Sequence, residues 1–125
     1  TDRLLFFTAS DSGRTAKGRK RLETIIGDPH TQLDQMIETS PLYRHRDIRA
    51  PVMLAHGKLD PRVDFEHAAR LQRVLALDGR PPVGLVFESA AHGFDDTGEV
   101  EILWRGIAGF LKENLGPAVG VTASN

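Results

Sequence analysis

The chain has 125 residues, of which 40% are hydrophobic, so it can form one packed domain or a piece of one. Sixteen basic and seventeen acidic residues leave a formal net charge of -1, which argues against nucleic-acid and membrane-surface roles, because these usually need a surplus of one sign. The absence of cysteine excludes disulfides, thiol nucleophiles and thiolate ligands of zinc. It leaves the compartment undecided, with the cytoplasm favoured. No apolar run approaches the roughly 20 residues of a membrane span.

The first half of the sequence predicts a loop and two helices. Residues 8–18 are polar and contain glycine, which is typical of a loop, and the helix that follows is expected to end at Gly27. A second helix is expected to begin at Asp28-Pro29, with the aspartate as its cap and the proline in its first turn. It should end before Pro41. Its predicted buried side contains Leu33, Met36 and Ile37.

The second half alternates between strand and helix patterns. The continuous apolar run over residues 52–55 predicts a strand that is covered on both faces. Asp64 is expected to cap a helix, and residues 83–87 predict a second short strand. A long amphipathic helix should follow Asp96, with Trp104 among its buried side chains. This order predicts two parallel strands joined by a right-handed crossover helix.

Two loops follow the expected strands, over residues 56–63 and 89–94. In open α/β sheets, functional groups lie on loops beyond the carboxyl ends of the strands. The first loop contributes Asp60 and the second contributes His92. A carboxylate beside an imidazole fixes the tautomer of the ring and stabilises the imidazolium that forms when the ring accepts a proton. In α/β-hydrolases the order is nucleophile, acid and histidine, and this chain has the last two in that order.

The sequence around these loops resembles the catalytic domain of the prolyl oligopeptidase family. The resemblance rests on SPL at residues 40–42, IRAPVMLAHGKLDPRV at residues 48–63 and AHGF at residues 91–94. It implies the C-terminal portion of an α/β-hydrolase, with parallel strands and crossover helices in an incomplete sheet. We expect this portion of the peptidase domain to span residues 1–117, followed by a flexible tail over residues 118–125.

The resemblance also implies roles for three residues. Asp60 is expected to be the acid of a catalytic triad, His92 its base, and Arg62 a ligand of a substrate carbonyl. The implied enzyme is a serine peptidase that cleaves short peptides, similar to dipeptidyl or acylaminoacyl peptidases, and it needs no cofactor or metal. No serine of this chain lies in the Gly-x-Ser-x-Gly pattern, so the nucleophile is expected upstream of Thr1 and the isolated chain is expected to be inactive.

Several alternatives remain open at this stage. The same two loops occur in esterases and in dienelactone-hydrolase-like enzymes, and a non-catalytic interaction domain could keep the same fold. Asp60 near Gly57 is also typical of a simple turn. A metal site formed by His56, Asp60 and His92 is conceivable, although their spacing matches no familiar ligand pattern.

The expected binding partners are a peptide or small ester substrate, without nucleic acid or membrane. The basic residues between Arg14 and Arg21 are interpreted as a solvated helix start, because no aromatic residues alternate with them to stack on bases. Parallel strands cut from a larger sheet leave edges without partners. We therefore also expect copies of the chain to self-associate through these exposed edges.

Overall fold

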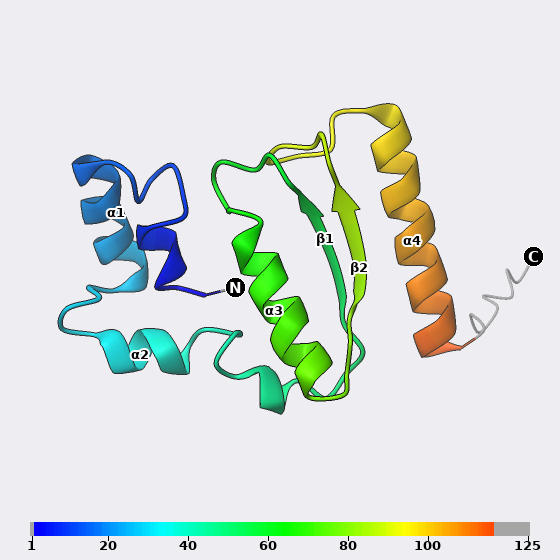
Figure 1. Ribbon diagram of the computed structural model, residues 1–125, viewed down its shortest axis with the longest axis horizontal. Coiled ribbons are helices and arrows are strands. Elements are labelled where there is room, and N and C mark those ends of the chain that lie inside the picture. The colour runs from blue at the N-terminus through cyan, green and yellow to red at the C-terminus, as the bar shows by residue number, and fades with distance from the viewer. Residues whose placement is uncertain (1, 117–125) are drawn as a thin grey trace, which may run out of the picture.

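The computed structural model describes residues 2–116 and shows a two-stranded parallel sheet with a helix on each side (Figure 1). Along the chain, the elements are η1 (Leu5–Phe7), α1 (Ala16–Ile26), α2 (Leu33–Glu38), η2 (His45–Asp47), β1 (Met53–Gly57), α3 (Glu66–Leu77), β2 (Val83–Phe87) and α4 (Thr97–Leu115). In the register of the sheet, Met53 lies opposite Val83 and Gly57 lies opposite Phe87. The predicted parallel strands and the crossover helix between them are confirmed.

Helix α3 covers the face of the sheet that holds the buried core. Leu42, Leu71 and Leu75 form the buried cluster, and its partly buried neighbours are Ile48, Val52, Leu54 and Val74. The helix begins at Glu66, one residue later than a cap at Asp64 predicts, because its N-cap is Phe65. The Asp64 carboxylate accepts the Glu66 N–H at 2.9 Å and so closes a turn just before the helix. It ends at Leu77, and Gly79 two residues later has a φ of 74°, a left-handed conformation that suits glycine.

Helix α4 covers the opposite face but buries far less. Asp96 caps it by accepting hydrogen bonds from the Gly98 and Glu99 N–H groups. Gly106 faces the sheet so closely that an added Cβ would lie 2.6 Å from Leu85 Cδ1. Trp104, two residues and about 200° away around the helix, points away from the sheet and is 64% exposed. The expectation that Trp104 is buried is therefore wrong, because Trp104 lies on the side of α4 opposite to the one that packs on the sheet.

The N-terminal helices begin at other residues than predicted. Helix α1 begins at Ala16, inside the expected loop, because the Thr15 hydroxyl accepts the Gly18 N–H at 3.0 Å. Helix α2 begins at Leu33 and not at Asp28. The Asp28 carboxylate instead accepts the His30 N–H at 2.8 Å, which closes a turn before the helix.

The burial of α2 follows the predicted pattern only in part. Met36 is fully buried, as expected, whereas Leu33 is 44% exposed at the start of the short helix. Leu33 is exposed because the helix lacks its predicted first turn, so that Leu33 is its first residue. The consequence is that Met36 anchors α2.

The sheet has no third strand within residues 2–116, so each strand of the pair has one edge without a strand partner. Pairing between copies through these edges remains a prediction. None of the helices in this part of the chain combines the length and the apolar character that crossing a membrane would demand. The predicted tail over residues 118–125 lies outside the described residues.

Candidate active site

The carboxyl ends of β1 and β2 are joined by hydrogen bonds between the loops that follow them. The Lys58 N–H donates to Phe87 O at 2.9 Å, and the Leu59 N–H donates to Ala90 O at 3.0 Å. At Gly57, the last residue of β1, an added Cβ would lie only 2.3 Å from Ala90 O. Glycine at this position therefore lets the two loops lie against each other, and the His-Gly pair after the first apolar run is the sequence signal for it.

Asp60 and His92 meet across these two loops. His92 Nδ1 lies 2.9 Å from Asp60 Oδ2, while Asp60 Oδ1 accepts the N–H groups of Arg62 and Val63, each at 2.9 Å. The Asp60 side chain is 8% exposed and the His92 side chain is 45% exposed. The expected proximity of carboxylate and imidazole is thus observed, with the acid sheltered and the ring accessible.

The surroundings of Asp60 favour its charged form. Burial raises the pKa of this carboxyl, but the hydrogen bonds from the Val63 N–H, from His92 and from the Arg62 N–H outweigh burial and hold the pKa below its usual value. An ionised carboxylate can only accept hydrogen bonds, so His92 Nδ1 carries the proton of this contact. In neutral His92 the other nitrogen, Nε2, is then an acceptor that can take up a proton.

His92 borders two hollows on the surface. One, of about 320 Å³, lies above the strand ends between Gly57 and Phe94. The other, of about 490 Å³, lies between the Asp60 loop and the N-terminal segment, and the exposed Arg62 borders it together with His92. Arg62 and His92 are thus brought to one surface, as expected from the sequence.

Two further residues support the loops, and sequence reasoning missed how they do so. His56 Nε2 contacts Val63 O at 2.7 Å, and the His56 ring stands edge-on to Phe65, with 5.8 Å between ring centroids. His56 Nε2 is 3.9 Å from Asp60 Oδ2, too long for a hydrogen bond. The Phe94 ring packs on Phe87 at a centroid distance of 4.7 Å and holds the second loop.

Within residues 2–116, no three His, Cys, Asp or Glu side chains gather in a way that could hold a metal ion. The serines of the same part of the chain are also engaged elsewhere. Ser10 donates to Phe6 O, Ser12 to the Asp11 carboxylate, Ser40 to Met36 O and Ser89 to Glu99. None of these hydroxyls is hydrogen-bonded to His92.

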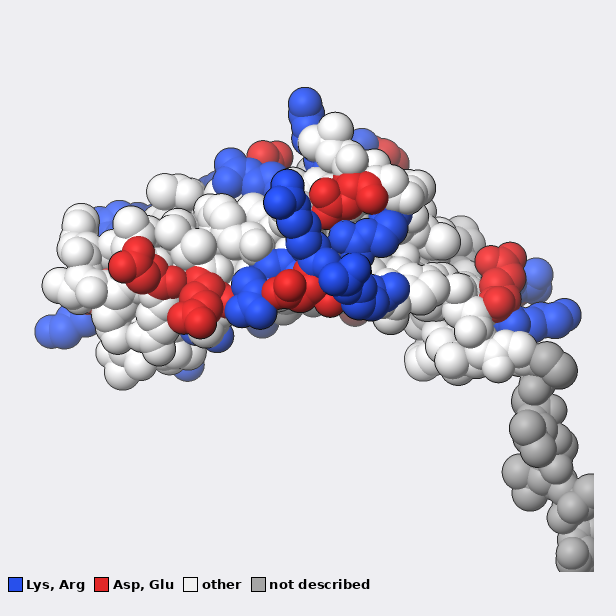
Figure 2. Space-filling view, turned by 90° about the horizontal axis from the view of Figure 1, so that it is seen from below, with Lys and Arg blue, Asp and Glu red and all other residues white. Residues whose placement is uncertain are grey.

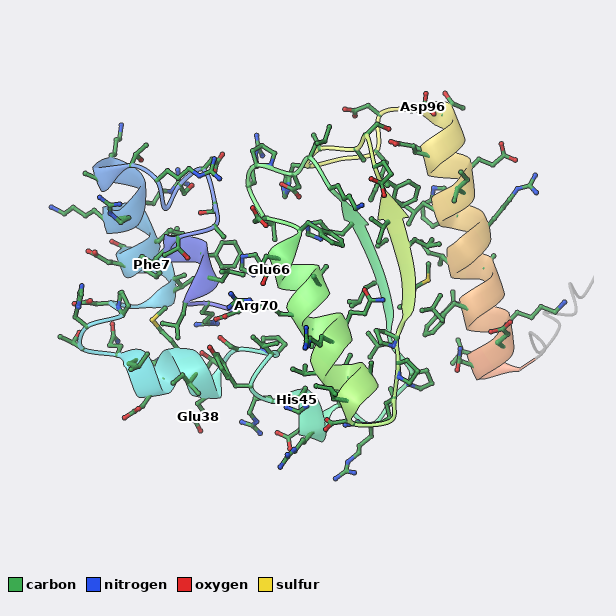
Figure 3. All side chains as sticks on the ribbon, viewed as in Figure 1. Phe7, Glu38, His45, Glu66, Arg70 and Asp96 are labelled. Carbon is green, nitrogen blue, oxygen red and sulfur yellow. The ribbon has the colours of Figure 1, made fainter. Side chains whose placement is uncertain are left out.

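A second histidine–aspartate pair lies at the opposite end of the molecule. His45 Nδ1 is 2.5 Å from Asp78 Oδ2, and Arg80 Nη2 is 3.1 Å from the same oxygen. Figure 3 shows His45 at the lower end and Asp96, which follows the His92 loop, at the upper end. Seen from below, Lys and Arg side chains surround acidic ones at this lower end (Figure 2). Only the Asp60–His92 pair lies at the carboxyl ends of the strands.

Comparisons with known proteins agree on one family. Residues 10–118 match the sequence profile of the prolyl oligopeptidase family. The chain is 27% identical over 99 residues to a dipeptidyl aminopeptidase BIII of Pseudoxanthomonas mexicana, a match that covers 78% of this chain and 14% of that protein. A puromycin-hydrolyzing peptidase of Mycobacterium tuberculosis is 28% identical and superposes with a TM-score of 0.82, covering 92% of this chain and 17% of that one. The chain thus spans less than a fifth of the length of these relatives.

Proposed function

The chain belongs to the prolyl oligopeptidase family and has part of its α/β-hydrolase fold, and from this premise we propose that Asp60 and His92 are the acid and the base of a Ser-His-Asp triad. The observation that carries the proposal is the 2.9 Å contact between His92 Nδ1 and Asp60 Oδ2 at the ends of two neighbouring parallel strands. The nucleophilic serine belongs to polypeptide upstream of Thr1. The placement of the serine outside this chain is supported by the matches to longer relatives, of which the chain covers 14% and 17%.

In the proposed reaction, His92 Nε2 takes the proton of the serine hydroxyl as the serine oxygen attacks the carbonyl carbon of the substrate. The proton then passes to the leaving amine, and water releases the acyl group in a second step. Asp60 keeps the His92 ring in the productive tautomer and stabilises its charged form. The lowered pKa of Asp60 suits this role, because the carboxylate must stay ionised.

The proposed substrates are short peptides, cleaved as in dipeptidyl or acylaminoacyl peptidases. Arg62 is exposed beside the 490 Å³ hollow that His92 also borders, and its guanidinium can donate hydrogen bonds to a substrate carbonyl. Peptidase relatives, one of them named as a dipeptidyl aminopeptidase, support a peptide bond over an ester as the natural target.

The first prediction tests the triad in the full-length protein that supplies the serine. Asp60→Asn should lower kcat by about 10⁴-fold, as the same change does in a well-studied serine peptidase, because an amide favours the wrong His92 tautomer. Secondary structure and the unfolding midpoint should stay close to those of the wild type. Hydrolysis of a chromogenic dipeptide amide measures the effect.

Asp95→Asn is a matched control, because Asp95 is exposed, lies three residues after His92 and forms no hydrogen bond or ion pair with it. This variant should keep wild-type turnover. Equal turnover in Asp60→Asn and Asp95→Asn would overturn the triad. Hydrolysis of simple esters without measurable cleavage of peptides would favour an esterase, and failure of a fluorophosphonate probe to label the full-length protein would favour a non-catalytic domain. The isolated chain should not be labelled.

A further inference from the structure

The 490 Å³ hollow beside His92 has walls that come from distant parts of the sequence. The Asp11 N–H donates to Pro61 O at 2.7 Å, and the Asp64 N–H donates to Ala9 O at 3.4 Å. These two backbone hydrogen bonds join the N-terminal loop to the loop that carries Asp60. The hollow is therefore bounded by ordered backbone on both sides.

Helix α1 closes the far side of the hollow. At Gly18, an added Cβ would lie 2.0 Å from Ser12 O, so the start of the helix lies tightly against the N-terminal loop. The Arg19 guanidinium is hydrogen-bonded to the N-terminal loop, because its Nη1 donates to Gly13 O at 3.1 Å. Arg21, two residues further on, borders the hollow instead.

The lining of the hollow combines apolar walls with positive charge. Its apolar part consists of Phe6, Leu22, Ile25 and Val63. Arg21 and Arg62 supply two guanidinium groups, and neither forms an ion pair within residues 2–116. The single carboxylate at the hollow, Asp11, already accepts the Ser12 N–H at 2.6 Å. Lys17 and Arg21 border an adjoining hollow of about 300 Å³, which extends the positive surface.

We propose that Arg21 binds a carboxylate of the peptide substrate and so gives the enzyme a preference for peptides that present a carboxylate near the scissile bond. This inference rests on the proposed function, because it places the scissile bond at His92 and Arg62 on a substrate carbonyl. A guanidinium pairs with a carboxylate through two parallel hydrogen bonds, and the apolar walls can pack against the methylene groups of an acidic side chain. Arg21 acts on substrate choice and takes no part in the chemical step.

The carboxylate can come from a glutamate side chain or from the free C-terminus of a short peptide. Four substrates separate these sources: a peptide with glutamate or glutamine at the position next to the scissile bond, each made with a free or an amidated C-terminus. A side-chain ligand makes the glutamate pair faster, whereas a terminal ligand makes the free-acid pair faster. Their kcat/KM values are compared in the full-length protein.

The test variant is Arg21→Glu, and the matched control is Lys20→Glu, since Lys20 is the neighbouring exposed cation and borders neither hollow. Both variants change the charge equally. Arg21→Glu should reduce the preference for the charged substrate by up to about fivefold, the upper end of what an exposed ion pair contributes, while kcat for the uncharged substrate stays unchanged. An equal change of preference in both variants, or no preference in the wild type, would overturn the inference while turnover itself still supports the triad.

A binding measurement keeps the inference testable without turnover. The 15N-labelled chain is titrated with N-acetylglutamate amide, N-acetylglutamine amide and N-acetylglutamine, and the Arg21 side-chain Nε–H signal is followed by NMR. One of the two carboxylates should shift this signal more than the neutral amide does, and the shift should persist in Lys20→Glu. Arg21→Glu lacks this signal, so the backbone N–H signal of Leu22, which borders the same hollow, is followed in all three proteins. The carboxylate should shift the Leu22 signal in the wild type and in Lys20→Glu but not in Arg21→Glu. Equal shifts for all three compounds would overturn the inference, whatever the activity of the full-length protein.

Discussion

The two histidine–aspartate pairs of this molecule are alike in their contact and opposite in their surroundings. At the carboxyl ends of the strands, the Asp60 oxygens are held by two backbone N–H groups and by His92, whose ring is 45% exposed beside two hollows. At the other end, the His45 and Asp78 side chains are each 19% exposed, and Arg80 shares the Asp78 oxygen that His45 contacts.

The comparison teaches which surroundings prepare such a pair for catalysis. The pKa of Asp78 is lowered first by the hydrogen bond from His45 and also by the charge of Arg80, so this carboxylate is already partly neutralised. Within residues 2–116 no Lys or Arg side chain pairs with Asp60, and His56 Nε2 is 3.9 Å away, so the charge of Asp60 is available to stabilise an imidazolium at His92. We infer that the His45–Asp78 pair stabilises the fold, whereas the Asp60–His92 pair is suited to proton transfer.

The strongest test of this contrast replaces each of the two histidines with glutamine, in two separate variants of the full-length protein. His92→Gln should lower kcat by about 10⁴-fold or more, because no group then accepts the serine proton. His45→Gln should leave kcat and KM unchanged. Peptide hydrolysis under saturating substrate measures both, and a comparable loss in the two variants would remove the distinction between the pairs.

A smaller effect is expected when the loops that hold the Asp60–His92 pair are pushed apart. In Gly57→Ala the new Cβ would meet backbone oxygens of Ala90 and Ala91, which cannot move as a flexible side chain can. A displacement of about 1 Å should lower turnover by about 10²-fold and cost about 1–3 kcal/mol of stability. Peptide hydrolysis and chemical denaturation of the variant measure the two effects.

The control for this change is Gly109→Ala on α4. Nothing lies within 4 Å of the Cβ that this substitution adds, and alanine favours a helix more than glycine does. The control should keep full turnover and gain up to about 1 kcal/mol of stability. If Gly57→Ala behaved like the control, the close approach of the two loops would not be what positions the pair.

Sequence reasoning predicted the carboxyl-end pair but not the other one. Asp60 and His92 follow two apolar runs of strand length, and parallel strands bring the loops after them to one edge, so their contact follows from topology. His45 and Asp78 are joined through η2, whose three residues carry no periodic pattern. The burial of Trp104 was also predicted wrongly, because the helical pattern identifies apolar positions but not which side of the helix packs on the sheet.

The smallest predicted effects concern two arginines, Arg80 beside the His45–Asp78 pair and Arg62 beside His92. Arg80 donates to Ile48 O, to His45 O and to the Asp78 carboxylate, and so joins the end of α3 to η2. Arg80→Ala leaves these acceptors without their donor and should lower the free energy of unfolding by about 1–2 kcal/mol, a value reduced for partial exposure. Chemical denaturation of the isolated chain measures this loss.

Arg62→Ala should weaken substrate binding and leave stability nearly unchanged. The Arg62 side chain is exposed and forms no ion pair within residues 2–116, so its removal should change stability by less than about 0.5 kcal/mol while raising KM in the full-length protein. Arg80→Ala should leave KM unchanged, since Arg80 is at the far end of the sheet. A raised KM in Arg80→Ala, or a clear loss of stability in Arg62→Ala, would mean that the two ends do not divide stability and substrate binding between them.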